Sequence, residues 1–414
     1  MSSLHVKIDF GNGLQDVGKL LLSEKLGRYV FSYDTGFIGS DLEISPFTLP
    51  LGADSFVAEK NSDLYDLHGV FADSLPDAWG KKVQDAEFAK IALDEPTALD
   101  RLAFVGKFGI GALRFEPSGE FEQGKQIVTL AQLRKATQKI LAGDFEDVAE
   151  ELLHCGGSAG GARPKFLVDL DIKTHSKIRY TAGVRDEEMV PVILKVPLRS
   201  GDHYQRIEYV YSVMGAKAGL EIPEVYLLTG GKSKSAFFAI ERFDVLKTGE
   251  RLHTHTLAGL QGWNFREVSS DYRELLRITG ELTRNHRDVV EVYKRMVFNY
   301  LGCNKDDHAK NFSFTMNKKG TWSLSPAYDI GYSSGENGLH AMAINGLRRN
   351  ATSDDFRRIA DDFDIREWKS IVAQTVEALN TWKSLAAEFG VTDRYVRMIQ
   401  ERIKENITRL GKKP

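Results

Sequence analysis

Three residues between positions 304 and 330 have the types and the spacing that phosphoryl transfer requires: Asp306, Asn311 and Asp329. A kinase catalytic loop places an aspartate to accept the hydroxyl proton, an asparagine five residues later for Mg²⁺, and a second metal-binding aspartate further along the chain. Asp306 lies five positions before Asn311, whereas Asp307 lies four before it, so the spacing selects Asp306 as the general base. Asn311 and Asp329 offer hard oxygen ligands, which suit Mg²⁺.

The residues around these three supply a fourth candidate and a local structure. His308 could donate to a phosphate oxygen in the transition state, although a single histidine is more often structural. Phe312–Met316 and Thr321–Ser325 alternate apolar and polar residues around a turn at 317–320, which predicts a β-hairpin. This hairpin would carry Asn311 at its start and Asp329 beyond its end.

A glycine-rich stretch, residues 156–165, precedes a predicted strand. Its glycines would let backbone N–H groups converge on an anion, and Lys165 adds a positive charge at its edge. It is not a Walker A loop, because Phe166 rather than Ser or Thr follows the lysine, and a strand rather than a helix comes next. Phosphate binding and a merely flexible connection both remain open from the sequence alone.

Lys195 lies in an apolar strand-like run, where a buried ammonium needs an anionic partner. ATP phosphates would serve, with Glu208 from the following helix as the candidate ion-pair partner. The alternative is a lysine whose head reaches solvent at a sheet edge. Backbone groups of Glu241 and Phe243 could meet adenine where this region ends; the alternative is an ordinary strand end with an Arg242–Asp244 surface pair.

Composition and charge exclude several classes of protein. Lys and Arg number 55 against 58 Asp and Glu, a formal charge of −3, so no global field draws the chain to nucleic acid or membrane. Cys155 and Cys303 are too few for a disulfide scaffold, and we expect free thiols and a cytoplasmic protein without a membrane span. His253 and His255 resemble a metal pair, yet no further ligand cluster lies near them in sequence.

The elements that must position these residues fall into three predicted regions. Residues 1–143 are rich in turns, with strands expected at 4–10, 28–33 and 112–115 and a packed turn at 77–80. They end in a helix with Thr129 as N-cap and Gly143 at its end. Residues 144–244 alternate strands around one helix to form a small α/β lobe. Residues 245–414 are mainly helical, with Trp368–Phe389 read as one helix whose aromatic stripe belongs to the core. The fold class predicted is α+β, with the bilobal arrangement of a protein kinase.

Five motifs in this order resemble the HipA family of bacterial serine/threonine toxin kinases: the glycine loop, the strand lysine, Glu-Arg-Phe-Asp at 241–244, Asp-Asp-His-Ala-Lys-Asn at 306–311 and Ala-Tyr-Asp-Ile at 327–330. Residues 73–80 and 104–112 resemble the N-terminal region of the family, so the likeness covers essentially the whole chain. The loop departs from the common family pattern at Arg163, where many members have glutamine.

The resemblance implies a Mg²⁺- and ATP-dependent kinase with Asp306 as catalytic base, His308 beside the phosphates, and Asn311 and Asp329 as metal ligands. It implies autophosphorylation at Ser158, which would expel the loop because a phosphoserine dianion cannot share the space of the ATP phosphates. The ATP-binding residues expected are Gly160, Gly161, Ala162, Arg163, Pro164, Lys165, Lys195, Glu241, Arg242, Phe243, His308, Lys310 and Tyr328.

The resemblance also implies partners, and the sequence leaves two other functions open. Family members commonly pair with a HipB-like DNA-binding antitoxin, which would make DNA contact indirect, and some phosphorylate an aminoacyl-tRNA synthetase. One alternative is a nucleotide-responsive component of a repressor complex, with Arg348, Arg349, Arg357 and Arg358 near DNA phosphates, though a solvated helix face is the simpler interpretation. The other is a small-molecule phosphotransferase, in which histidine usually precedes the aspartate by two residues.

Overall fold

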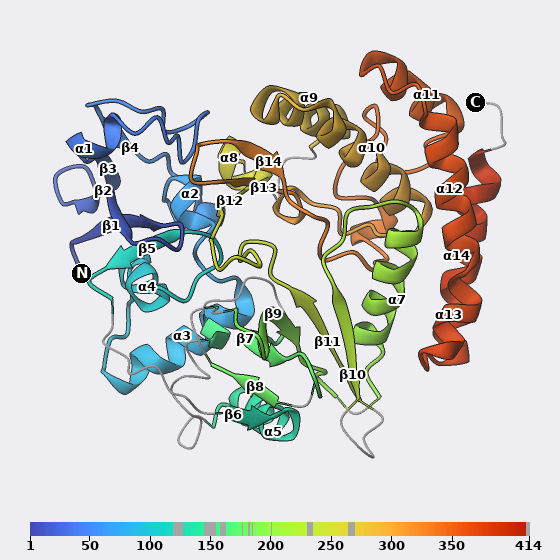
Figure 1. Ribbon diagram of the computed structural model, residues 1–414, viewed down its shortest axis with the longest axis horizontal. Coiled ribbons are helices and arrows are strands. Elements are labelled where there is room, and N and C mark those ends of the chain that lie inside the picture. Colours follow the sequence, from blue (N-terminus) through green and yellow to red (C-terminus); the bar gives the residue numbers. More distant parts are fainter. Residues whose placement is uncertain are drawn as a thin grey trace. The chain divides into compact units, whose positions relative to one another are not determined.

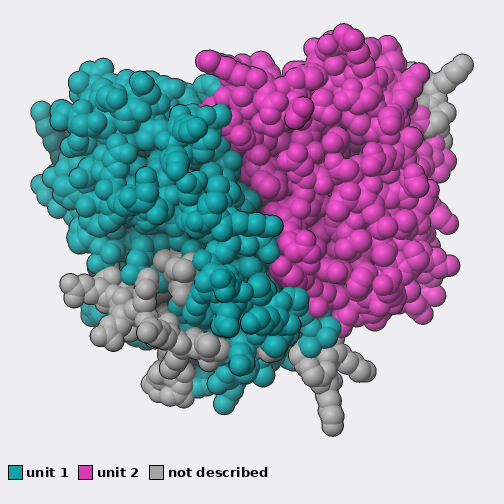
Figure 2. All heavy atoms as spheres, viewed as in Figure 1, with its two compact units in different colours: residues 1–202, 228–264, 315–321 teal, residues 203–227, 265–314, 322–414 magenta. Residues whose placement is uncertain are grey.

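The computed structural model describes all residues except 119–126, 145–154, 158–162, 176, 181–182, 184, 200, 230–234, 264–269 and 411–414, and the side chain of Ile127. The chain forms two compact units (Figures 1 and 2). Unit 1 contains residues 1–202, 228–264 and 315–321, and unit 2 contains residues 203–227, 265–314 and 322–414. This division is coarser than the three regions read from the sequence, whose boundaries stay a prediction.

Unit 1 begins with a five-stranded sheet in the order β4-β3-β2-β1-β5. Its strands are β1 (Ser3–Asp9), β2 (Leu14–Ser23), β3 (Arg28–Tyr33), β4 (Ser55–Val57) and β5 (Leu113–Glu116). Leu4, Val6 and Ile8 are buried while the residues between them are less so, which gives β1 the two-residue period of a sheet with one covered face. The strands predicted at 4–10, 28–33 and 112–115 are therefore confirmed.

The helices of this region lie between strands β3 and β5 in sequence: α1 (Thr35–Ile38), η1 (Ser62–Leu64), α2 (Gly69–Ala72), α3 (Ala78–Lys90) and α4 (Ala98–Val105). The expectation of a packed turn at residues 77–80 was wrong, because these residues are the N-cap and first turn of the 13-residue helix α3. Its weak amphipathic pattern hid the helix, since the buried Trp79, Val83 and Phe88 are interspersed with small, polar and charged residues.

A second sheet in unit 1 runs β11-β9-β7-β8-β6, and β10, whose last two residues belong to this unit, extends it at β11. Its strands are β6 (Ile127–Thr129), β7 (Lys165–Asp171), β8 (Lys177–Arg179), β9 (Met189–Lys195), β10 (Val225–Thr229) and β11 (Ala236–Glu241). β7 and β9 pair antiparallel from Lys165↔Lys195 to Asp171↔Met189. β7 is buried over its first six residues, as expected of a central strand.

Helix α5 (Leu130–Ala142) has the predicted cap at each end. Thr129 and Gln132 form a capping box, and Gly143 ends the helix with a φ of 82°, a left-handed conformation that glycine adopts at little cost. β12 (His253–Thr256) and α8 (Leu257–Gln261) complete unit 1.

Unit 2 is mainly helical, as the sequence predicted. Its helices are α7 (Tyr204–Lys217), α9 (Tyr272–Thr283), α10 (His286–Leu301), η2 (Ala309–Asn311), η3 (Glu336–Gly338), α11 (Ser353–Asp362), α12 (Trp368–Asn380), α13 (Trp382–Glu388) and α14 (Asp393–Leu410). The hairpin of β13 (Ser313–Met316) and β14 (Trp322–Leu324) is also confirmed; its turn is counted with unit 1, where β12 lies beside β13.

The predicted helix Trp368–Phe389 is in fact two helices, α12 and α13. Thr381 interrupts it: its hydroxyl donates to the Ala378 carbonyl at 2.6 Å and competes with the helical backbone bonds. The interruption lies next to Trp382, which is fully buried and donates its indole N–H to the Val396 carbonyl at 3.1 Å. The core assignment of the stripe holds for Ile371, Leu379 and Trp382.

Among the residues that the structure describes, no helix is both long and apolar enough to cross a bilayer. Three sheets, of which the two larger are mainly antiparallel, occur together with a separate group of helices, which confirms the predicted α+β class.

Candidate active site

The candidate catalytic loop begins where α10 ends. Gly302 caps the helix, Cys303 follows with a left-handed φ of 57°, and Asn304 turns the chain away from the helix. Asn299 holds this reversal, because its carbonyl accepts the Asn304 N–H at 2.8 Å and its side-chain oxygen accepts the Asn304 amide at 3.0 Å. The loop therefore starts from a fixed point on a buried helix.

Asp306 and Asp307 point to opposite sides of the loop. The side chain of Asp306 is 68% exposed and that of Asp307 is 0% exposed. The Asp307 carboxylate accepts four hydrogen bonds, from the Tyr272 hydroxyl at 2.9 Å, His340 Nδ1 at 3.0 Å, Ala341 N–H at 2.9 Å and Met342 N–H at 3.3 Å. Only Asp306 of the two therefore presents a carboxylate that a substrate hydroxyl could reach.

His308 and Asn311 lie on the same loop as Asp306. His308 Nε2 is 3.8 Å from Asp306 Oδ1. The short helix η2 forms as the Asn311 N–H donates to the His308 carbonyl at 2.8 Å, and the Asn311 side-chain amide donates to the Asp306 carbonyl at 2.7 Å. That second bond uses the amide NH₂ group and leaves the side-chain oxygen, the atom that a metal ligand must offer.

The hairpin returns the chain to this loop at Tyr328. The Tyr328 hydroxyl donates to the Lys310 carbonyl at 2.8 Å and shares a further hydrogen bond with the Ser313 hydroxyl. The tyrosine thus ties the segment before Asp329 to the residues on either side of Asn311. Asp329 has a φ of 50°, a left-handed conformation that aspartate tolerates better than most residues.

A buried ion pair supports the segment leading to Tyr328. Arg295 Nε lies 3.0 Å from Glu291 Oε1, and its Nη2 donates to the Ser325 carbonyl at 2.6 Å. The same Glu291 oxygen accepts the Glu221 N–H at 3.0 Å, while the Glu221 carbonyl accepts the Ala327 N–H at 2.7 Å. Helix α10 therefore holds both ends of the candidate site, the loop through Asn299 and the aspartate segment through Arg295.

Helix α7 packs against the residues after Asp329. A Cβ built on Gly215 would meet Ile330 at 3.0 Å, and one built on Gly331 would lie 3.9 Å from the Glu208 Cα. The close approach of α7 at Gly215 depends on the absence of a side chain there. Glu208, the predicted partner of Lys195, lies within unit 2 and Lys195 within unit 1, and their pairing stays a prediction.

The donor set at Asn311 and Asp329 fits Mg²⁺. One amide oxygen and one carboxylate leave room for water and phosphate oxygens, which Mg²⁺ retains in nucleotide sites. Within the described part of the chain, no three His, Cys, Asp or Glu side chains gather in a way that could hold a metal by themselves. An all-protein metal cage, such as structural zinc requires, is therefore not found among those residues.

In unit 1, Lys165 and Lys195 are register partners on the neighbouring strands β7 and β9. Both are largely buried, with 8% and 9% of each residue exposed, and Lys195 Nζ lies 5.6 Å from the centre of the Phe238 ring on β11. Directly paired residues lie on one face of a sheet, so two ammonium groups share that face. Such a pair favours an anion there, since like charges opposite one another repel.

The Arg242–Asp244 pair is buried, so the alternative of a surface pair was wrong. Arg242 Nη2 and Nε lie 2.6 and 3.0 Å from the two Asp244 oxygens, and each side chain is 1% exposed. Burial raises the pKa of Asp244. The charge and the hydrogen bonds of Arg242 lower it by more, so the pKa of Asp244 lies below its usual value. Arg242 is also bonded through its N–H to the Pro191 carbonyl at 2.9 Å, so its main-chain donor is used within the sheet.

Other predicted nucleotide residues divide between described and undescribed parts. Glu241 pairs with Arg185 at 2.6 Å, and Pro164 accepts the Val196 N–H at 3.0 Å, which anchors the end of the glycine-rich stretch to β9. Ser158, Gly160, Gly161 and Ala162 lie outside the described residues. Arg163, which is half-buried, and Phe243 are described but remain without an assigned role.

The two histidines of 253–255 serve the fold of unit 1. His253 Nε2 bonds the Ile44 carbonyl at 2.8 Å, and burial lowers its pKa to about 4. His255 lies between Asp73, at 2.6 Å from Nδ1, and Ser45, at 2.9 Å from Nε2. Ser45, His255 and Asp73 thus have the connectivity of a catalytic triad, but Ser45 and His255 are completely buried, so they hold loops together.

Sequence reasoning missed Asp307, Tyr272 and His340 as parts of the site. Asp307 was considered only as a rival to Asp306, and no spacing rule connects it to residues 35 and 33 positions away. Burial raises the pKa of Tyr272, and the Asp307 charge raises it further, so the hydroxyl stays protonated and donates. The adjacent acidic pair was the available signal, since neighbouring side chains in an extended segment point to opposite sides.

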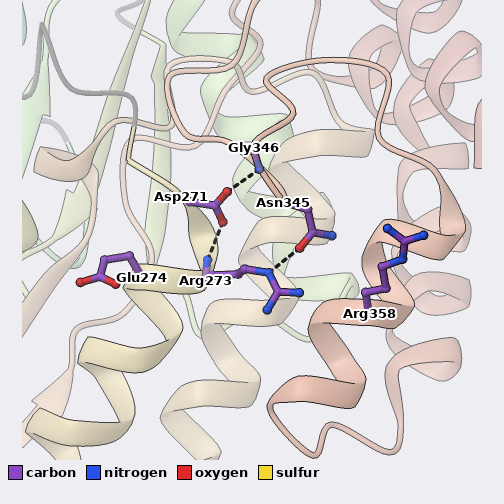
Figure 3. Close-up of a pocket in the computed structure, with 6 residues that line it drawn as sticks. All are labelled: Asp271, Arg273, Glu274, Asn345, Gly346 and Arg358. Atoms are coloured by element: carbon purple, nitrogen blue, oxygen red, sulfur yellow. Dashed lines mark hydrogen bonds between the residues drawn. The ribbon is translucent and has the colours of Figure 1, made fainter.

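A shallow hollow of about 550 Å³ lies in unit 2 between the start of α9, residues 345–346 and α11 (Figure 3). Its lining residues are Asp271, Arg273, Glu274, Asn345, Gly346 and Arg358. Asp271 accepts the N–H groups of Arg273 at 2.8 Å and Gly346 at 2.7 Å, and Arg358 pairs with Asp354 at 2.9 Å. Arg357 also pairs with Asp354, so α11 presents the solvated ion-pair face expected at these arginines.

Comparisons with known proteins agree with this architecture. The family model for the HipA-like C-terminal domain matches residues 157–405, and that for the HipA N-terminal domain matches residues 12–116. A putative kinase of Sinorhizobium fredii is 29% identical over 150 residues, and one of Haemophilus influenzae is 29% identical over 124 residues. These stretches cover 33% and 27% of this chain and 36% of each relative, so the chain spans about a third of their length.

A chain from the Shewanella oneidensis MR-1 toxin–antitoxin complex of HipA, HipB and operator DNA is similar over 98% of this chain and 96% of its own, with a TM-score of 0.70 and 16% identity. This likeness supports the predicted HipA-type fold over the whole chain. Because the C-terminal family model alone matches more than half of the residues, the chain belongs to the HipA family.

Proposed function

We propose that this protein is an ATP- and Mg²⁺-dependent protein serine/threonine kinase of the HipA toxin type. The observation that carries the proposal is the loop 306–311, where an exposed carboxylate, a nearby histidine and an oriented asparagine amide follow one another. The two relatives named as putative kinases and the family membership support the same reaction class.

In this proposal Asp306 accepts the proton of the acceptor hydroxyl, and its exposure leaves it open to a protein substrate. His308 contributes a hydrogen bond to phosphate oxygens, and Lys165 and Lys195 contribute positive charge toward the nucleotide phosphates. Asn311 and Asp329 would hold Mg²⁺, which when bound neutralises phosphate charge. Catalysis would consist mainly of positioning and charge stabilisation, as phosphoryl transfer requires.

Incubation with labelled ATP and Mg²⁺ tests the proposal. We expect the purified protein to label itself, with the phosphate at Ser158 by mass spectrometry, and Asp306→Asn to label far more slowly. Asp354→Asn, on the exposed face of α11, is the matched control and should label like the wild type. Equal labelling of wild type and Asp306→Asn would remove Asp306 from this role, and labelling of aminoglycosides or choline instead of protein would favour a small-molecule phosphotransferase.

The proposed partner is a HipB-like DNA-binding antitoxin, by analogy with the Shewanella oneidensis complex of HipA, HipB and operator DNA. DNA contact would then be made mainly by the partner. The isolated chain should show no steeply salt-dependent DNA affinity, whereas its mixture with the antitoxin should bind operator DNA. Tight, salt-dependent binding by the isolated chain without ATP turnover would favour the repressor-component alternative.

A further inference from the structure

We propose that Asp307 is the positioning residue of the catalytic loop: its buried carboxylate fixes the loop so that Asp306 and His308 face outward together. The inference rests on the proposed function and assigns a role to the second acidic residue of the pair. Asp307 touches no substrate in this proposal and acts through Asp306.

The four donors to Asp307 come from two separate segments, α9 and residues 340–342. Oδ1 accepts the Ala341 and Met342 N–H groups, and Oδ2 accepts the Tyr272 hydroxyl and His340 Nδ1. A carboxylate can accept about four hydrogen bonds, so this one is saturated. Asp307 therefore cannot rotate without breaking bonds in a site from which water is excluded.

The donors are themselves held in place. The Tyr272 hydroxyl also accepts the Asn299 amide at 3.1 Å, and Asn299 is the α10 residue that holds the start of the loop at Asn304. The His340 ring stacks on Tyr300, also on α10, with ring centres 5.0 Å apart. Helix α10, α9 and residues 340–342 are thus joined at one buried carboxylate.

The direction of Asp306 follows from this anchoring. In extended backbone successive side chains point to opposite sides, and residues two apart point to the same side. With Asp307 held inward, Asp306 faces outward, and His308 returns to the Asp306 side, where Nε2 lies 3.8 Å from Oδ1. The 68% exposure of Asp306 and the 0% exposure of Asp307 fit this alternation.

Asp307→Asn tests the inference because it keeps the shape and removes the charge. The amide oxygen can still accept the two backbone N–H groups, but its NH₂ then faces the donors of Tyr272 and His340. We expect kcat to fall about 100-fold, the loss that a displacement of about 1 Å in a catalytic group produces. The KM for ATP should not change.

Two comparisons separate positioning from general destabilisation. In an Asp306→Asn background the second change, Asp307→Asn, should cause a much smaller further loss, because the base that it positions is gone and only His308 remains to be displaced. The matched control is Asp355→Asn in the same unit, a buried carboxylate that accepts the Thr352 N–H at 2.8 Å and hydroxyl at 2.9 Å. It should keep the wild-type kcat.

Wild-type kcat in Asp307→Asn, a full additional loss in the Asp306→Asn background, or an equal loss in Asp355→Asn would each overturn the inference. If the wild-type protein transfers no phosphate at all, the proposed function fails. Amide hydrogen exchange then tests whether Asp307 holds the loop in place. Asp307→Asn should then speed exchange at the Ala341 and Met342 amides, which donate to Asp307, relative to Asp355→Asn. Unchanged protection at these amides would refute it.

Discussion

Asp244→Ala should be among the most destabilising single substitutions in unit 1. Asp244 contacts the Arg242 guanidinium at 2.6 and 3.0 Å and accepts the Gly111 N–H at 2.7 Å, and both charged side chains are 1% exposed. Arg242 also donates to the Gly109 carbonyl at 3.1 Å. The pair thus links the strand end at 241–244 to the glycine-rich turn at 109–111, two motifs that the sequence separates by more than 130 residues.

Removal of the carboxylate would leave the guanidinium buried without its counter-charge. Breaking such a buried pair costs about 3–5 kcal/mol, whereas a solvent-exposed pair contributes about 0–1 kcal/mol. We therefore expect Asp244→Ala to lower the free energy of unfolding by about 3–5 kcal/mol. Because the folded-state pKa of Asp244 is lowered, its contribution is fully present above the unfolded pKa of about 3.9 and is lost only as the pH falls through the folded value, so pH 7 is a suitable condition.

Urea-induced unfolding at pH 7, followed by circular dichroism, measures the effect. Asp354→Ala removes two solvent-exposed ion pairs near the start of α11, with Arg357 and Arg358, and should lower the free energy of unfolding far less than Asp244→Ala does. The double variant Arg242→Met/Asp244→Leu should recover most of the loss, since apolar residues replace buried ion pairs at little cost. A loss below about 1 kcal/mol for Asp244→Ala would show that the pair behaves as a solvated one and would refute the reasoning.

Three further outcomes are expected. Lys195→Met should abolish the rise in Tm that ATP and Mg²⁺ cause, because it removes one of two ammonium groups on the same sheet face. An undiminished rise in Tm, measured by differential scanning fluorimetry, would contradict a role of Lys195 in nucleotide binding. Asp329→Asn should lose kinase activity but keep its stability. Asp329→Ala should lose activity and also about 1 kcal/mol of unfolding free energy in urea, because alanine disfavours the φ of 50°. Equal stability of the two variants would argue against backbone strain at this position. Unit 1 should lose stability as the pH falls from about 6.5 to 4, because the folded-state pKa of His253 is lowered to about 4 and the buried ring must stay neutral. His253→Gln should flatten this part of the plot of stability against pH. An unchanged plot would assign the loss of stability to another group.

Local patterns in the sequence were sufficient where short-range physics decides the structure. The capped helix after Thr129, the hairpin between Asn311 and Asp329 and the strands that carry Lys165 and Lys195 were all predicted, because capping, alternation and turn chemistry act over a few residues. The spacing of Asp306 and Asn311 likewise reflects one short loop.

Contacts between distant segments could not be predicted from these patterns. The sequence alone did not show that Asp307 is saturated by Tyr272 and residues 340–342, or that Arg242 and Asp244 are buried against the 109–111 turn. It also misjudged residues 77–80 and the break at Thr381, where buried aromatic neighbours and a side-chain hydrogen bond outweigh local propensity. The sequence by itself determined which residue types the candidate site contains and how they are spaced along the loop. The tertiary structure decided which of the two adjacent carboxylates faces solvent, because burial and hydrogen-bond donors come from segments that meet only in the folded chain.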